Sequence, residues 1–108
     1  MSRTLGVDPG LHETGWAVLD GASAAPRLVA SGVIRTLPGV PLPLRLKAIH
    51  AELAAVISAH APESCAMEEM FFTTIATTVR ATLQARGVTL LAVALRLHDA
   101  VCRGGARR

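Results

Sequence analysis

The chain has 108 residues and a mass of 11.3 kDa, which is the size of a single ordinary domain. Hydrophobic residues make up 51% of it and charged residues 18%, and this composition excludes a chain that is disordered throughout. The formal net charge of +3 is unevenly placed, because residues 80–108 carry six arginines against one acid, and such a basic end suits either a polyanionic partner or a solvated terminus.

The first third of the chain predicts three strands. An apolar run over residues 4–7 leads into the turn Asp8-Pro9-Gly10, so Asp8 is expected at the carboxyl end of the first strand. Residues 15–19, which run into Asp20-Gly21, and residues 28–36 are typical of a second and a third strand. Three strands in succession favour an antiparallel start to the sheet.

A proline-rich loop and an amphipathic helix follow these strands. The loop covers residues 37–43, where three prolines remove N–H donors and bias their predecessors toward extended geometry. From Leu44, apolar residues recur at three- and four-residue steps, at Leu46, Ile49, Leu53, Val56 and Ile57. This spacing predicts a helix that ends near residues 59–62.

The next predicted element is a short buried strand over residues 64–68. Because a crossover helix allows a parallel return to the sheet, this strand is expected beside the first, with Glu68 next to Asp8. Residues 74–97 are compatible with a second helix. The residues after that helix lose all periodicity, and we expect a basic irregular tail over 99–108.

Asp8 and Glu68 are the main candidates for chemistry. Two carboxylates that converge at one edge of a sheet repel each other unless a cation joins them, and a divalent metal is the natural partner. Magnesium prefers hard oxygen ligands and keeps several waters, so it can bind a phosphate and supply a water nucleophile. No Cys/His cluster with zinc spacing competes. Asp-Pro-Gly is also a common turn, so the spacing alone leaves a purely structural role open.

Six short blocks stand in order between residues 3 and 95. They are Leu5-Gly6-Val7-Asp8-Pro9-Gly10, Thr14-Gly15, Ser31-Gly32-Val33-Ile34-Arg35-Thr36, Arg45-Leu46-Lys47, Met67-Glu68-Glu69-Met70-Phe71-Phe72 and Gln84-Ala85-Arg86-Gly87-Val88. In order and spacing, these blocks resemble the RuvC family of Holliday-junction resolvases.

The resemblance implies an α/β protein with a ribonuclease H-like fold. In such a fold, three antiparallel N-terminal strands and a fourth strand would form a mixed sheet. A crossover helix would precede the fourth strand, and a long helix would follow it. The resemblance also implies a homodimer that cuts two symmetric strands of four-way junction DNA, with Mg²⁺ as its cofactor and two ions in the complete family site. A branch-migration helicase complex is a further partner that it suggests. Asp8 and Glu68 match the acids that bind metal and carry catalysis in the family.

Two further residues are candidates for contact with DNA. Phe71 matches an aromatic placed near the bases of the junction, where one ring can stack on an exposed base. Its structural alternative is a core phenylalanine that caps the sheet. Arg86 is a candidate phosphate contact, with an ion pair or a place at the dimer surface as its alternatives. Glu69 falls on a variable position and is expected to be a solvated neighbour of Glu68.

The sequence also departs from the family pattern. Thr73-Thr74-Ile75 stands where the family usually has Ala-Lys-Asn, so DNA affinity is expected to be lower. The family continues through another strand, a basic loop and a helix with two further acids, and Asp99 comes too soon to match either of them. We therefore expect residues 1–98 to form a nuclease domain that lacks the C-terminal part of the fold. Such a two-acid site should bind Mg²⁺ weakly and catalyse poorly.

Two other functions stay open at this point. One is a non-catalytic remnant that dimerises or binds junction DNA without cutting it. The other is an actin-like nucleotide binder, because the glycine-containing loop after Asp8 is similar to a phosphate-binding loop. The N-terminus lacks the apolar core of a signal peptide, and the longest apolar stretch, residues 88–95, is far shorter than the ~20 residues of a membrane span. We expect a cytoplasmic protein with reduced thiols and no membrane role.

Overall fold

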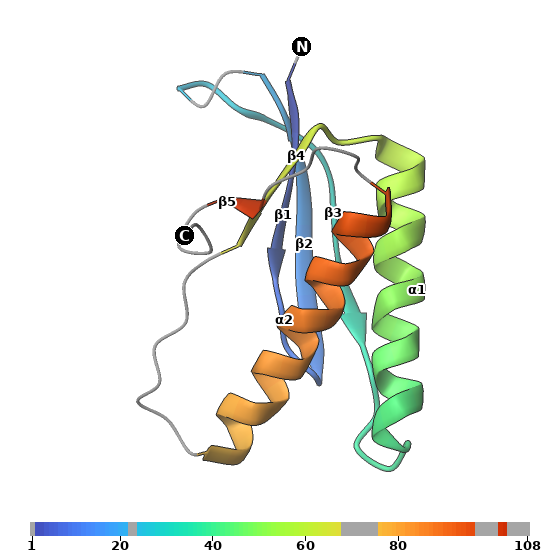
Figure 1. Cartoon of the computed structure of the whole chain (residues 1–108). Helices are drawn as coiled ribbons and strands as arrows, with labels where there is room; N and C mark the ends of the chain where they lie inside the picture. Colours follow the sequence, from blue (N-terminus) through green and yellow to red (C-terminus); the bar gives the residue numbers. More distant parts are fainter. Residues whose placement is uncertain (1, 22–23, 68–75, 97–101, 104–108) are drawn as a thin grey trace.

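The computed structural model describes residues 2–21, 24–67, 76–96 and 102–103, with side chains throughout these ranges except at 76–79 and 102–103. The elements in chain order are β1 (Arg3–Asp8), β2 (Glu13–Asp20), β3 (Arg27–Arg35), α1 (Leu42–His60), β4 (Ser64–Met67), α2 (Ala76–Arg96) and β5 (Cys102–Arg103). The strands form one sheet with the order β3-β2-β1-β4-β5. Both helices pack on the same face of this sheet (Figure 1).

β1 lies at the centre of the sheet and pairs with a strand on each side. β2 is antiparallel to it, with Arg3 opposite Asp20 at one end and Asp8 opposite Gly15 at the other, and β3 is antiparallel to β2. β4 is parallel to β1, and Val7 is the partner of Met67. The prediction of three antiparallel strands followed by a parallel fourth is therefore confirmed.

Alternation along the strands separates a core face from an open face. Leu5 and Val7 of β1 are buried beneath the helices, so Asp8 falls on the opposite face and is exposed. The core combines residues from four strands and both helices: Leu5, Val7, Val18, Ile34, Ile49, Leu53, Ile57, Cys65, Met67, Ala85, Ala92 and Val93. The sheet thus presents the carboxylate of Asp8 on the side away from its hydrophobic core.

The first helix, α1, begins at Leu42, two residues before the predicted start. Pro43 lies within its first turn, where a missing N–H costs nothing because no intrahelical acceptor would receive it. The helix ends at His60 and is capped by Ala61, which has a left-handed backbone with φ of 48° and donates its N–H to the Ile57 carbonyl at 2.8 Å. The proline-rich loop is therefore shorter than the sequence predicted.

The core-facing stripe of α1 differs from the prediction at one position. Ile49, Leu53 and Ile57 are buried as expected, but the first buried residue of the stripe is Arg45, whereas Leu46 is half-buried. Arg45, Ile49, Leu53 and Ile57 are spaced by four residues and therefore share one side of the helix. Arg45 therefore occupies the buried position that the apolar pattern assigned to Leu46.

α2 and β5 complete the described fold. α2 covers Ala76–Arg96, close to the predicted range of 74–97, and β5 pairs in parallel with β4 so that Cys102 is the partner of Cys65. The expected irregular tail over 99–108 thus contains two residues of strand, because the edge of β4 offers backbone donors and acceptors for pairing. The other residues of that tail lie outside the described ranges.

Candidate metal centre

Asp8 is the described half of the predicted carboxylate pair. It is the last residue of β1, it is exposed, and it forms no ion pair with any arginine or lysine in the described ranges. Its neighbour Val7 is in register with Met67, the last residue of β4. Glu68 follows Met67 in the sequence but lies outside the described residues, so the position of its carboxylate stays a prediction.

The turn after Asp8 is closed by a buried threonine. Thr14 is 0% exposed, and its Oγ1 donates to the Gly10 carbonyl at 2.7 Å and accepts the Gly10 N–H at 3.2 Å. A Cβ atom at Gly10 would run into the backbone carbonyl of Glu13, so glycine is needed for this close approach. Both residues lie within blocks of the family resemblance, and the structure shows their roles in the turn.

The structure also places Arg45, Thr36 and His12 in one hydrogen-bonded cluster near this turn. Sequence reasoning missed this cluster because the helical pattern was assigned from apolar residues only. The four-residue spacing of Arg45 from Ile49 was a signal for the burial of Arg45, but not for its partners.

The metal chemistry expected here needs oxygen donors. Asp8 supplies a hard carboxylate at a solvent-accessible strand end, which fits Mg²⁺. Within the described ranges, no group of three or more His, Cys, Asp or Glu side chains could hold a metal ion. A centre built on Asp8 needs at least one further oxygen donor, and Glu68 is the predicted one.

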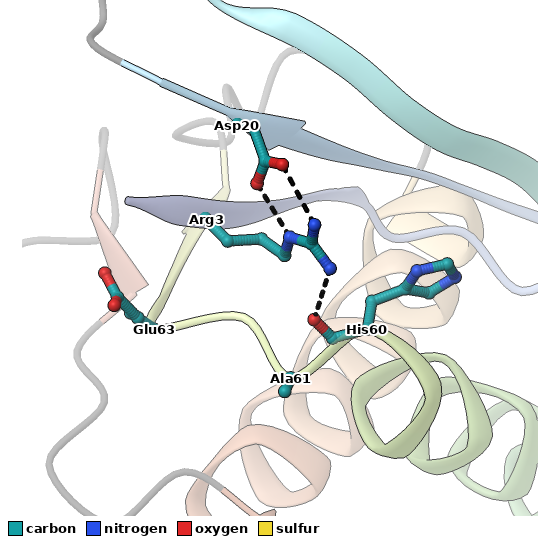
Figure 2. Close-up of a pocket in the computed structure, with 5 residues that line it drawn as sticks. All are labelled: Arg3, Asp20, His60, Ala61 and Glu63. Atoms are coloured by element: carbon teal, nitrogen blue, oxygen red, sulfur yellow. Dashed lines mark hydrogen bonds and ion pairs between the residues drawn. The ribbon is translucent and has the colours of Figure 1, made fainter. Parts of the chain in front are cut away.

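Arg3 and Asp20 form a second polar cluster at the other end of β1 (Figure 2). Arg3 Nε and Nη2 donate to the two oxygens of Asp20 at 2.7 and 2.9 Å, and Arg3 Nη1 donates to the His60 carbonyl at 2.9 Å. These residues line a pocket of about 380 Å³ together with Ala61 and Glu63. All three nitrogens of the guanidinium are engaged, so this pocket is held by a structural ion pair.

The same ion pair changes the protonation of its partners. The hydrogen bonds from Arg3 lower the pKa of the Asp20 carboxyl below its ordinary value, against the opposing effect of burial. The nearby charge of Arg27, whose Nη2 lies 3.6 Å from Asp20 Oδ2, acts in the same direction. Asp20 was not among the predicted functional residues, although the hairpin register that brings it opposite Arg3 makes the pair possible.

The remaining predicted contact residues have different outcomes. Phe71 lies outside the described residues, and its role stays a prediction. Arg86 is half-buried on α2 and has an interaction partner within the protein. Trp16 packs on the sheet, where its ring lies so close to Gly32 that an added Cβ there would be 2.8 Å from it. No helix in the described part of the chain is long and apolar enough to span a membrane.

Comparison with known proteins gives a consistent result. The family model of the crossover junction endodeoxyribonuclease RuvC matches residues 4–103. The RuvC protein of Pelotomaculum thermopropionicum is 47% identical over 90 residues, which are 83% of this chain and 55% of that protein. The RuvC protein of Alkalilimnicola ehrlichii is 39% identical over 92 residues, which are 85% of this chain and 55% of that protein.

Solved structures agree with these sequence relatives. Thermus thermophilus RuvC in complex with a Holliday junction substrate superposes with a TM-score of 0.87 at 28% identity, covering 96% of this chain and 64% of that one. A further Thermus thermophilus RuvC structure has a TM-score of 0.81 at 30% identity, with 94% and 63% covered. The chain spans about half the length of the curated relatives it matches. The predicted ribonuclease H-like fold is confirmed, and the chain belongs to the RuvC family of crossover junction endodeoxyribonucleases.

Proposed function

We propose that this chain is a structure-specific endonuclease that resolves four-way DNA junctions by metal-dependent phosphodiester hydrolysis. The observation that carries this proposal is the parallel pairing of β1 with β4, in which Val7 is the partner of Met67. Asp8 and Glu68 are the next residues along these two strands. Family membership supports the substrate, because one related structure holds a Holliday junction.

Asp8 and Glu68 would together hold Mg²⁺. When bound, the ion supplies an activated water and neutralises charge that develops on the phosphate. The chain contributes the carboxylates and the rigidity of the central strand that carries Asp8, whose preceding residues are part of the buried core. Two carboxylates offset the cost of dehydrating Mg²⁺ less well than a larger acidic set, so we expect weak ion binding and slow cleavage.

DNA contacts are assigned to Phe71 and Arg86. The ring of Phe71 would stack on an exposed base of the junction, and Arg86 would meet a phosphate. Arg80, on the same helix, is exposed, so α2 offers positive charge to a polyanion in addition to Arg86. Arg86→Ala is expected to weaken junction binding without abolishing it, because the positive charge of Arg80 on the same helix remains.

A homodimer is supported by the outer face of α2. Buried residues such as Ala85, Thr89 and Ala92 face the core, while large apolar side chains face solvent on the other side of the helix. These exposed residues are Leu83, Leu90, Leu91 and Leu95. A helix that is apolar on both sides is typical of one that is covered on both sides. We propose that a second copy covers this face.

The test of the proposed function is a labelled four-way junction incubated with the protein and Mg²⁺. Symmetric nicks that disappear with Asp8→Asn and persist with Glu69→Gln support the endonuclease. A shifted but uncut junction would instead show the non-catalytic binder. Stabilisation by ATP with indifference to branched DNA would favour the actin-like nucleotide binder, and either result would overturn the proposal.

A further inference from the structure

Arg45 is a buried cation without an acidic partner in the described part of the chain. Arg45 is 7% exposed, and no Asp or Glu of the described ranges forms an ion pair with it. Burial of a guanidinium is unfavourable unless its N–H groups are hydrogen-bonded. The residues that accept hydrogen bonds from Arg45 therefore explain how its guanidinium can be buried.

Thr36 and His12 accept hydrogen bonds from two of the three guanidinium nitrogens of Arg45. Arg45 Nε donates to Thr36 Oγ1 at 2.9 Å, and Arg45 Nη2 donates to the Thr36 carbonyl at 3.5 Å. Arg45 Nη2 also lies 3.0 Å from His12 Nδ1. Arginine can only donate, so His12 Nδ1 is the acceptor of this hydrogen bond. One side chain of α1 thus connects the end of β3 with the segment between β1 and β2.

Thr36 extends this connection to the backbone of the same segment. Its Oγ1 donates to the Leu11 carbonyl, and its N–H donates to the His12 carbonyl at 3.1 Å. Leu11 and His12 are three and four residues after Asp8 in the sequence. On the other side, Thr14 holds Gly10 through two hydrogen bonds. The turn that follows Asp8 is therefore held by side chains from two directions.

We propose that Arg45 is a positioning residue that fixes the turn of residues 9–12 through Thr36 and His12. By holding this turn, Arg45 also fixes the end of β1 that carries Asp8. The link from the turn to metal binding rests on the function proposed above; the link from Arg45 to the turn does not. Lysine cannot replace Arg45 in this role because a single ammonium lacks the rigid fork that reaches Thr36 and His12 together.

Amide hydrogen exchange tests the structural half of this proposal. In Arg45→Gln we expect faster exchange at the amides of Thr36 and Gly10, with little change at Ala61, whose N–H is bonded at the far end of α1. Equal acceleration at all three amides, or no acceleration at Thr36 and Gly10, would overturn the assignment. Thr36→Val and Thr36→Ser give the same test if Arg45→Gln does not fold, because only serine keeps the bridging hydroxyl and should restore slow exchange at Gly10.

Binding of Mn²⁺, used as a spectroscopic probe for the magnesium site, tests the second half. Arg45→Gln and Thr36→Val should each weaken Mn²⁺ affinity by about tenfold, as expected for residues that orient a metal ligand, and Thr36→Ser should restore it. Unchanged affinity in Arg45→Gln and Thr36→Val would overturn the positioning role. If the wild-type chain binds no Mn²⁺ while the exchange pattern holds, Arg45 still positions the turn and the proposed metal function is the part that fails.

Discussion

Val7 and Met67 are direct partners on neighbouring parallel strands, and an acid follows each of them in the sequence. Val7 is 6% exposed and Met67 is 2% exposed, so both strand ends are anchored in the core. A shift of one residue in this pairing would turn every side chain of β4 to the other face of the sheet, so that Ser64 and Ala66 would replace Cys65 and Met67 in the core. The hydrophobic core therefore specifies the register on which the proposed carboxylate pair depends.

Acid should destabilise the protein partly through Asp20. The pKa of Asp20 is lower in the folded protein than its ordinary value of 3.8, so its stabilising effect is complete above that value. The effect is lost as the pH falls through the lower, folded pKa. Asp20→Asn should therefore lower the free energy of unfolding at neutral pH and should flatten its fall below about pH 4. Urea unfolding at a series of pH values measures both effects.

Glu13→Gln is the matched control for Asp20→Asn. Glu13 pairs with Arg35 at 3.1 Å, but the two side chains are 62% and 68% exposed, so water screens the interaction. This variant should leave the stability at neutral pH nearly unchanged. Equal losses of unfolding free energy in Asp20→Asn and Glu13→Gln would show that the Arg3–Asp20 pair stabilises the protein no more than an exposed ion pair does.

Gly10→Ala should destabilise the turn after Asp8. The added Cβ meets the Glu13 carbonyl, which belongs to the backbone and can move only if the turn changes shape. We expect a loss of about 1–3 kcal/mol in the free energy of unfolding. Gly39→Ala is the control, because no atom lies within 4 Å of its added Cβ and it should stabilise the chain by up to about 1 kcal/mol. Losses of the same size in both variants would contradict the crowding described at Gly10.

Leu53→Ala should test the packing of α1 against the sheet. Leu53 is 1% exposed, and its removal leaves a cavity between the helix and the strands. The expected cost is about 2–5 kcal/mol in the free energy of unfolding. Leu44→Ala on the same helix should change stability by less than about 0.5 kcal/mol, because Leu44 is 54% exposed. Chemical denaturation of the two variants makes the comparison, and a larger loss for Leu44→Ala would contradict the assigned core face.

Leu91→Glu should disrupt the proposed homodimer. Leu91 is 53% exposed in the single chain and lies among the other exposed leucines of α2, so a charge there would be buried on association. Sedimentation velocity should show a dimer for the wild type and a monomer for Leu91→Glu. Leu37→Glu is the control, since Leu37 is 68% exposed in the loop before α1. A monomeric wild type, or dissociation by both substitutions, would contradict an α2 interface.

The sequence predicts the strand pattern well because the signals are local. The turn at Asp8-Pro9-Gly10 marks the end of β1, and the apolar spacing through Ile49 and Leu53 marks the buried side of α1. Arg45 was missed because its burial depends on hydrogen bonds to Thr36 and His12, which lie 9 and 33 residues away in the chain. The periodicity of apolar residues predicts which side of one helix or strand is buried, but it does not predict hydrogen-bond partners on other elements.

The candidate site is predicted less completely than the fold. The sequence and the family resemblance point to Asp8, and the pairing of β1 with β4 supports its place at the centre of the sheet. The pairing of Arg3 with Asp20 requires the register of a hairpin whose connection is longer than a two-residue turn, and such a connection leaves the register open. The second carboxylate, from Glu68, still rests on its position in the sequence.

Titration of the protein with Mn²⁺, followed by electron paramagnetic resonance, tests the shared metal site most directly. If Asp8 and Glu68 hold one ion, Asp8→Asn and Glu68→Gln should each weaken binding by at least about tenfold, or ~1.4 kcal/mol, while Glu69→Gln retains the wild-type affinity. The double variant should lose less than the sum of the two single losses, because both substitutions act on the same ion. Wild-type affinity in Asp8→Asn or Glu68→Gln, or an equal loss in Glu69→Gln, would contradict a site formed jointly by the ends of β1 and β4.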